Sequence, residues 1–240
     1  MNNTEITNLV SLSGTIVGKY ETTACHVFIL AITEPTRRRT GEVVAQTNYP
    51  RVYFFKQDNT GAEKFDRGDH VDIVAHVAAP RKTRPGSDRT YYSQSIIGES
   101  IKATESNSLV NEVLPGRSAV KAENIVYLKG EVERVERVAP NVNLITMSAY
   151  NKRFYNRVQF TSYDATTVAI VPGNTIVIEG KIRTSERDGR DGEKRRFQNI
   201  VARTVNDLGV VPRENDNRID YKAEKAAAMK EANETQPLAI

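Results

Sequence analysis

The chain has 240 residues, of which 39% are hydrophobic and 27% are charged, and it contains one cysteine and no tryptophan. A single cysteine, Cys25, excludes an intrachain disulfide and a multi-cysteine zinc site. No apolar run reaches the length of a membrane span, and the chain does not open on a signal-peptide pattern, so we expect a cytoplasmic protein. The net charge of +4 permits a polyanionic partner without requiring one.

Residues 1–103 read as short β-strands separated by turn residues, with 13 basic and 11 acidic side chains among them. Strands are predicted over about 8–20, 25–33, 50–56, 70–78 and 91–102. Residues 104–123 contain Pro115 and Gly116 and are expected to form an exposed linker.

Residues 124–207 repeat this pattern and carry 14 basic and 10 acidic side chains. Strands are predicted over about 124–137, 142–150, 154–162, 174–183 and 195–206. In the tail, 208–240, residues 219–233 have strong helix propensity, and the last residues are expected to fray.

The two halves share short motifs in the same order. Residues 8–14 match 124–130, 51–54 match 157–160, 68–74 match 173–179 and 94–97 match 198–201. A repeated unit of about a hundred residues is a duplicated domain. Because five strands per unit is the count of the OB-fold, we predict an all-β chain of two tandem OB-fold barrels with a C-terminal helical tail.

The predicted third strand of the first copy has two faces, because side chains alternate along a strand. Val52 and Phe54 suit the core. The opposite face then carries three aromatic residues and an arginine: Tyr49, Arg51, Tyr53 and Phe55. Nucleobases stack on such rings, at about 1–3 kcal/mol per base, and the arginine can bind a phosphate. The second copy offers Tyr155 and Arg157 in these positions. The alternative is that the rings form a second apolar layer beneath a loop.

The loop between the predicted fourth and fifth strands is basic in both copies. The first copy offers Arg81, Lys82, Arg84, Arg89 and Tyr91. The second offers Arg183, Arg187, Arg190, Lys194, Arg195, Arg196 and Phe197. Further cations lie in the longer second loop of the first copy and in its shorter counterpart: Arg37, Arg38, Arg39, Lys152 and Arg153. These residues are candidate contacts for a phosphate backbone, and a solvated turn is the alternative for each.

The sequence lacks the motifs of the common enzyme classes, including the phosphate-binding loop and the zinc protease motif. His26, His70 and His76 are the only histidines, and no other ligands support a metal site around them. We therefore expect structural histidines, no cofactor and no metal, in a binding protein and not an enzyme.

Taken together, these residues resemble the bacterial-type single-stranded DNA-binding proteins. Residues 177–184, the charged loop after them and Arg196-Phe197 are similar to the family's fourth strand, its loop and the entry to its fifth strand. Residues 49–52 and 155–158 resemble its aromatic-x-Arg-Val entry into the third strand. The resemblance implies sequence-non-specific binding of single-stranded DNA in replication, recombination or repair. It implies stacking by Tyr49, Phe55 and Tyr155 and backbone contacts by Arg51 and Arg157.

The chain also departs from that family. Family members usually carry one OB-fold per chain and assemble four, so two fused copies imply a homodimer. The family's tryptophans and its acidic tail with a hydrophobic tip are missing, which leaves open whether this tail recruits replication or recombination proteins or docks on a neighbouring subunit. The divergence suggests a phage or plasmid version. Two other functions stay open: an OB-fold interaction or dimerisation module of a replication complex, and an RNA-binding or strand-annealing protein.

Overall fold

The structure is a computed structural model, and it describes residues 8–37, 40–79, 81–83, 86, 90–104, 122–151, 154–163, 170–188 and 194–211. The chain forms two compact units, 1–210 and 211–240. Only Val211 of the second unit is described, so the predicted helical tail lies outside the described residues, as does nearly all of the predicted linker. The domain boundaries drawn from the sequence stay predictions.

Five strands close a barrel in the first repeat: β1 (Asn8–Glu21), β2 (Cys25–Arg37), β4 (Arg51–Phe55), β5 (His70–Ala78) and β8 (Ser95–Ala103). β1 pairs antiparallel with β2 and β5, β5 pairs with β8, and β2 pairs with β4. A parallel pairing of β4 with β8 completes the ring. Two short 3-10 helices, η1 (Lys56–Asp58) and η2 (Ala62–Lys64), connect β4 to β5.

The second repeat closes in the same way: β9 (Glu123–Ala139), β10 (Val142–Asn151), β11 (Phe154–Ser162), β12 (Thr175–Asp188) and β13 (Lys194–Asp207). β9 pairs with β10 and β12, β12 with β13 and β10 with β11, and β11 runs parallel to β13. The prediction of an all-β fold with two OB-fold barrels is confirmed.

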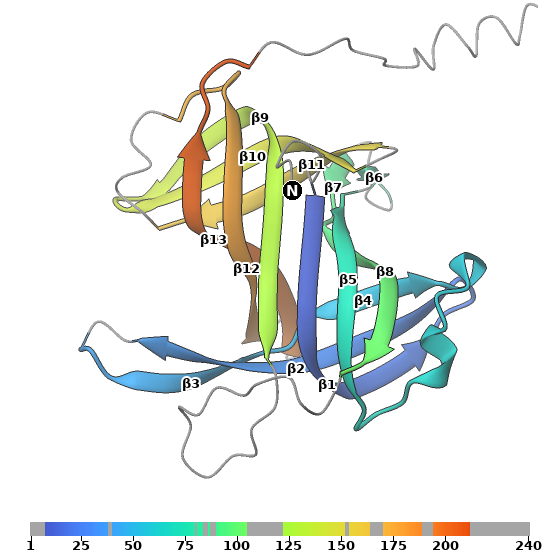
Figure 1. The fold of residues 1–240 in the computed structure, drawn as a ribbon. Coiled ribbons are helices and arrows are strands. Elements are labelled where there is room, and N and C mark those ends of the chain that lie inside the picture. Colours follow the sequence, from blue (N-terminus) through green and yellow to red (C-terminus); the bar gives the residue numbers. More distant parts are fainter. Residues whose placement is uncertain are drawn as a thin grey trace, which may run out of the picture. The chain divides into compact units, whose positions relative to one another are not determined.

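The two barrels share one continuous sheet, because β1 pairs antiparallel with β9 (Figure 1). Val10 lies opposite Val126 in this pairing, and these two residues are also equivalent positions of the two repeats. The approximate two-fold axis that relates the repeats therefore passes between Val10 and Val126. Both valines are fully buried, so the junction belongs to the hydrophobic core.

The core confirms the predicted inward face of β4. Val52 and Phe54 are fully buried, and the Phe54 ring packs against Phe28 with their centroids 5.7 Å apart. Gly98 is required beside them, because a Cβ atom at that position would lie 2.2 Å from the Phe54 ring. Inward-facing residues of both barrels form one cluster of buried side chains.

Two connections differ from the prediction. The segment after residue 33, predicted as a loop, continues β2 and turns back as β3 (Val43–Asn48). Pro35 obscures this strand in the sequence because proline lacks an amide donor. It is tolerated because β2 pairs with β1 only as far as Ala31, so one side of the strand beyond it makes no ladder with a described residue. The loops between the fourth and fifth strands are also partly ordered, by β6 (Arg81–Thr83) and β7 (Thr90–Tyr92) and by the long ends of β12 and β13.

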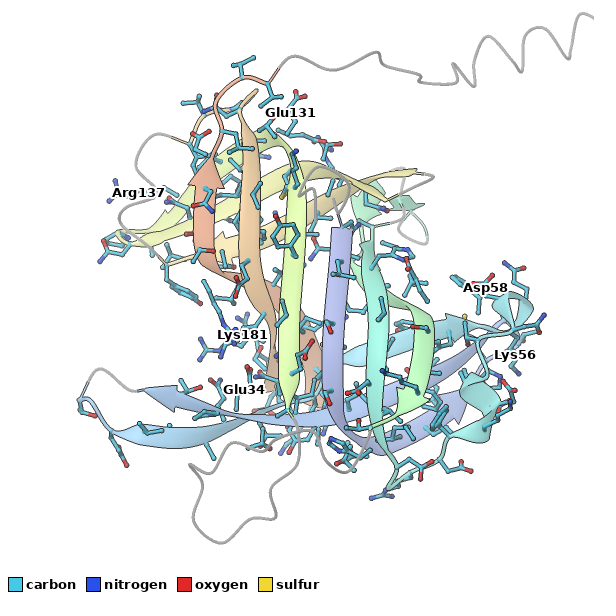
Figure 2. The ribbon with its side chains drawn as sticks, in the orientation of Figure 1. Glu34, Lys56, Asp58, Glu131, Arg137 and Lys181 are labelled. Atoms are coloured by element: carbon cyan, nitrogen blue, oxygen red, sulfur yellow. The ribbon has the colours of Figure 1, made fainter. Side chains whose placement is uncertain are left out.

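The β2–β3 hairpin reaches the second repeat through Glu34. Its carboxylate lies 2.8 Å from Arg203 Nη2 and 3.7 Å from Lys181 Nζ, and it accepts a bond from Asn124 Nδ2 at 3.4 Å. Figure 2 shows Glu34 on β2 and Lys181 on β12 directed toward one another. The Glu34 side chain is only 12% exposed, so these ion pairs fix the hairpin against the second barrel.

Each repeat is also braced by a buried asparagine at the same position. Asn8 Oδ1 accepts from Val77 N and its Nδ2 donates to Val77 O, and Asn124 makes the same two bonds with Ile182. We expect Asn124→Ala to lower the free energy of unfolding by about 1–3 kcal/mol, because it leaves a buried N–H and C=O unpaired. Urea denaturation measures this. The control is Asn174→Ala, which removes a partly exposed amide and is expected to cost less than about 0.5 kcal/mol. Equal losses in the two variants would show that the brace is not needed.

Candidate nucleic-acid interface

The outward face of β1, β2 and β4 in the first repeat forms an aromatic surface. Cross-strand pairing puts Tyr20, Val27 and Tyr53 in one row, and Ile29 beside Arg51 in the next. Val27 points outward but is fully buried, which shows that the flanking side chains cover it. Val27 is therefore an apolar contact between Tyr20 and Tyr53, and the Arg51 guanidinium lies at the edge of this surface.

Tyr20, Arg51 and Tyr53 interact closely. The Arg51 guanidinium carbon lies 5.7 Å from the centroid of the Tyr20 ring. Burial raises the pKa of Tyr20 above 10.0, against the opposing effect of the Arg51 charge, so this phenol is neutral at physiological pH. Burial pulls the pKa of Arg51 down, but its hydrogen bond to Tyr53 and its interaction with Tyr20 outweigh that effect and raise it. The surface therefore combines the neutral Tyr20 phenol with a fixed positive charge.

The β12–β13 hairpin of the second repeat lies against this surface. Tyr49 N donates to Thr184 Oγ1 at 2.9 Å, and Arg51 N donates to Gln198 Oε1 at 3.0 Å. Thr184 N in turn donates to Asn48 Oδ1 at 3.1 Å. In each of these bonds a backbone N–H of one repeat donates to a side-chain oxygen of the other, and the bonds run in both directions. Together they fix the hairpin against residues 48–51.

A groove of about 300 Å³ lies between these elements. Residues of both repeats line it: Ile29, Tyr49, Arg51, Tyr53, Ser93, Gln94, Ser95, Thr184, Arg196, Phe197 and Gln198. The Arg196 guanidinium carbon lies 5.4 Å from the centroid of the Tyr49 ring. Aromatic rings and guanidinium groups around one groove can stack bases and bind phosphates at the same time.

The reciprocal contact corrects the sequence match between the third strands. Gln94 of the first repeat accepts a hydrogen bond from Gln159 N, as Gln198 does from Arg51 N. Asn156 Oδ1 accepts from Ala79 N, as Asn48 Oδ1 does from Thr184 N. The parallel pairings agree, because Val52 lies opposite Ile96 and Phe160 opposite Ile200.

Arg51 is therefore equivalent to Gln159 and not to Arg157, so the sequence match was wrong by two residues. A slip of two keeps every side chain on its face, which is why the hydrophobic pattern could not reveal it. Tyr49 and Tyr53 then correspond to Arg157 and Thr161. Arg157 also forms an ion pair with Glu133 across the strands. The described side chains of the second face are thus more polar than those of the first.

The chain was compared with known proteins. No protein-family model and no curated protein matches it. Among solved structures, the single-stranded DNA-binding protein of Thermus aquaticus aligns over 87% of this chain and 96% of its own, with 16% identity and a TM-score of 0.62. This chain has the same fold. A deletion mutant of that protein aligns over 87% of this chain and 98% of its own, also with 16% identity and with a TM-score of 0.63. The resemblance seen in the sequence is thus confirmed for the fold, over both barrels.

Apart from Arg157, which pairs with Glu133 on the second repeat, the predicted contact residues fall into three groups in the structure. Tyr49, Arg51, Tyr53 and Arg196 meet at the groove, with Phe197 at its edge and Phe55 on the same face of β4. Arg183, Arg187 and Lys194 are exposed on the β12–β13 hairpin, where Arg187 lies over the Phe197 ring. The remaining predicted side chains lie outside the described part of the molecule: Arg37, Arg38, Arg39, Arg81, Lys82, Arg84, Arg89, Tyr91, Lys152, Arg153, Tyr155, Arg190 and Arg195.

Sequence reasoning missed Tyr20, Thr184, Gln94 and Gln198 as residues of this site. Tyr20 ends the predicted strand over 8–20, and only its row with Tyr53 shows its role. Gln94 and Gln198 recur in the two repeats, which is a detectable signal. What the sequence does not state is that each glutamine binds the other repeat.

The histidines make contacts within the barrels. His70 Nδ1 lies 3.0 Å from Thr15 Oγ1, and His76 Nδ1 lies 2.8 Å from Glu99 Oε1. Among the described residues no group of three or more histidine, cysteine or acidic side chains could hold a metal ion. Within the same residues there is no helix long and apolar enough to cross a membrane.

Proposed function

We propose that the protein binds single-stranded DNA without sequence specificity and protects it in replication, recombination or repair, without catalysis. The observation that carries this proposal is the groove in which Tyr49, Tyr53, Arg51 and Arg196 converge. Rings supply stacking to any base, and Arg51 supplies attraction to the backbone. The fold shared with the Thermus protein, whose name states that it binds single-stranded DNA, supports it.

Fluorescence anisotropy of a labelled oligo-dT, titrated at several salt concentrations, tests the proposal. We expect log affinity to fall linearly with log salt, with a slope near −0.7 per phosphate neutralised. At about 4–16 nucleotides per OB-fold, two barrels predict a footprint of roughly 8–32 nucleotides per chain. Duplex DNA is the control. Equal binding to duplex, or no binding to dT at low salt, would refute the proposal. Tighter binding to an RNA oligonucleotide of the same sequence would favour the RNA-binding alternative.

We further propose that two copies of the chain assemble through the outer face of the shared sheet, which would bring four OB-folds together. Around the β1–β9 junction this face is lined by apolar side chains: Leu9, Val74, Ile125, Tyr127 and Val177. Val74 is 39% exposed there. The approximate two-fold axis runs through this face, so its apolar side chains are arranged nearly symmetrically about that axis. A symmetric homo-oligomer interface requires such a self-complementary surface.

Val74→Arg is expected to convert such a dimer into monomers, because the charge would have to be buried at the interface. Size-exclusion chromatography with light scattering measures the mass. Val138→Arg is the matched control, since Val138 is 56% exposed and lies on β9 near its hairpin with β10. A Val74→Arg protein that keeps the wild-type mass would place the interface elsewhere. A wild-type monomer would refute the dimer while leaving DNA binding untouched.

A further inference from the structure

Arg196 reaches the first repeat's aromatic surface from the second repeat, and its place there is fixed. Pairing between β12 and β13 sets Thr184 opposite Gln198 and Glu186 opposite Arg196. Thr184 and Gln198 bind the backbone of Tyr49 and Arg51, so this face of the hairpin is the one directed at the first repeat. Arg196 lies two residues along the same face, and its guanidinium carbon is 5.4 Å from the Tyr49 centroid.

The guanidinium is held by its edge. Arg196 Nε donates to Glu186 Oε1 at 2.5 Å. Because all N–H bonds of a guanidinium lie in its plane, this acceptor occupies an edge and covers neither face. The Arg196 side chain is 45% exposed, so the hairpin does not enclose it. Tyr49 supports the group from one side, and Glu186 fixes its rotation.

We propose that Arg196 is a stacking residue whose planar guanidinium packs against a nucleobase of the bound strand, with Tyr49 behind it and Glu186 as its positioning residue. This inference rests on the proposed binding of single-stranded DNA. A phosphate clamp would not need the edge-on carboxylate, which neutralises the charge that a phosphate requires. A stacked guanidinium needs a fixed plane and tolerates that partner, since arginine is weakly hydrated and stacks on π-systems. The second repeat thereby completes the base-binding surface of the first.

The experiment compares two ligands that share every phosphate and differ only in their bases. Wild type, Arg196→Ala and Arg196→Lys are titrated at low salt with oligo-dT and with an oligonucleotide of the same length made of tetrahydrofuran abasic sites. We expect Arg196→Ala to weaken dT binding on the order of tenfold, and Arg196→Lys to weaken it almost as much, because lysine keeps the charge without the plane. On the abasic ligand both variants should stay within about twofold of wild type.

Equal loss on both ligands, or full rescue by Arg196→Lys, would overturn the stacking role and make Arg196 a phosphate contact. Wild-type affinity for dT in Arg196→Ala would overturn it as well, while wild type that binds neither ligand would overturn the proposed function itself. Arg134→Ala is the matched control, because Arg134 is also an exposed arginine of the second repeat paired with a glutamate, Glu136, away from the groove. Thermal denaturation of each variant shows whether a loss of affinity comes from unfolding. If Arg196→Ala unfolds, Arg196→Lys distinguishes stacking from a phosphate contact, because lysine keeps a positive charge beside Glu186.

Discussion

Replacing Tyr53 by alanine is expected to weaken binding of oligo-dT by about 5- to 100-fold while the protein stays folded. Tyr53 lies on the other side of Val27 from Tyr20 in the aromatic surface. It also lines the groove and makes a hydrogen bond with Arg51. Its removal would delete a stacking partner worth about 1–3 kcal/mol and release the arginine beside it. Adding Phe55→Ala, on the same face of β4, is expected to weaken binding further. Anisotropy titrations at one salt concentration measure both effects.

The control for Tyr53→Ala is the equivalent change in the second repeat, Thr161→Ala, because the strand pairings place Thr161 opposite Val201 as Tyr53 lies opposite Ile97. Its affinity is expected to stay within about twofold of wild type, since no ring is lost. Unchanged affinity in the Tyr53→Ala variant would remove β4 from the binding site.

Replacing Phe54 by alanine is expected to lower the free energy of unfolding by about 3–5 kcal/mol. The ring is fully buried, packs against Phe28 and occupies the space that Gly98 leaves open. Alanine would leave a cavity that β-strands on several sides cannot close. Urea denaturation followed by circular dichroism measures the change.

The neighbours Tyr53 and Phe54 thus make a matched pair, since one points to each face of the same strand. Tyr53→Ala is expected to reduce binding strongly and stability little, and Phe54→Ala is expected to do the reverse where the protein remains folded. A Phe54→Ala variant that unfolds at the wild-type urea concentration would contradict the assignment of the inward face of β4.

Much of the fold could be predicted because the decisive signals are local. The alternation of apolar and outward side chains around Val52 and Phe54 indicates the two faces of a strand. The repeated order of motifs indicates the duplication. The segment 43–48 could not be identified as a strand, because its pairing depends on a neighbour that contains Pro35. The hydrophobic pattern of a segment does not predict an edge strand well when contacts with the neighbouring strand stabilise it.

The candidate site was only partly predictable for a different reason. The face that holds Tyr49, Arg51 and Tyr53 follows from periodicity within one strand. The groove depends on the β1–β9 pairing, which brings the hairpin with Arg196 over the other repeat. The alternation of side chains also does not reveal a register shift of two residues. The sequence match therefore equated Arg51 with Arg157, whereas the strand pairings equate Arg51 with Gln159.

Photocrosslinking tests most directly whether single-stranded DNA binds at this groove. Oligo-dT that carries 5-iodouracil would be irradiated with the full-length protein, and the crosslinked peptides would be mapped by mass spectrometry. We expect crosslinks at Tyr49 and Tyr53, and at Phe197 on the hairpin of the second repeat, all lost in competition with unlabelled dT. Crosslinks confined to Tyr127, on the outer face of the shared sheet, or no competable crosslink at all, would contradict the proposed groove.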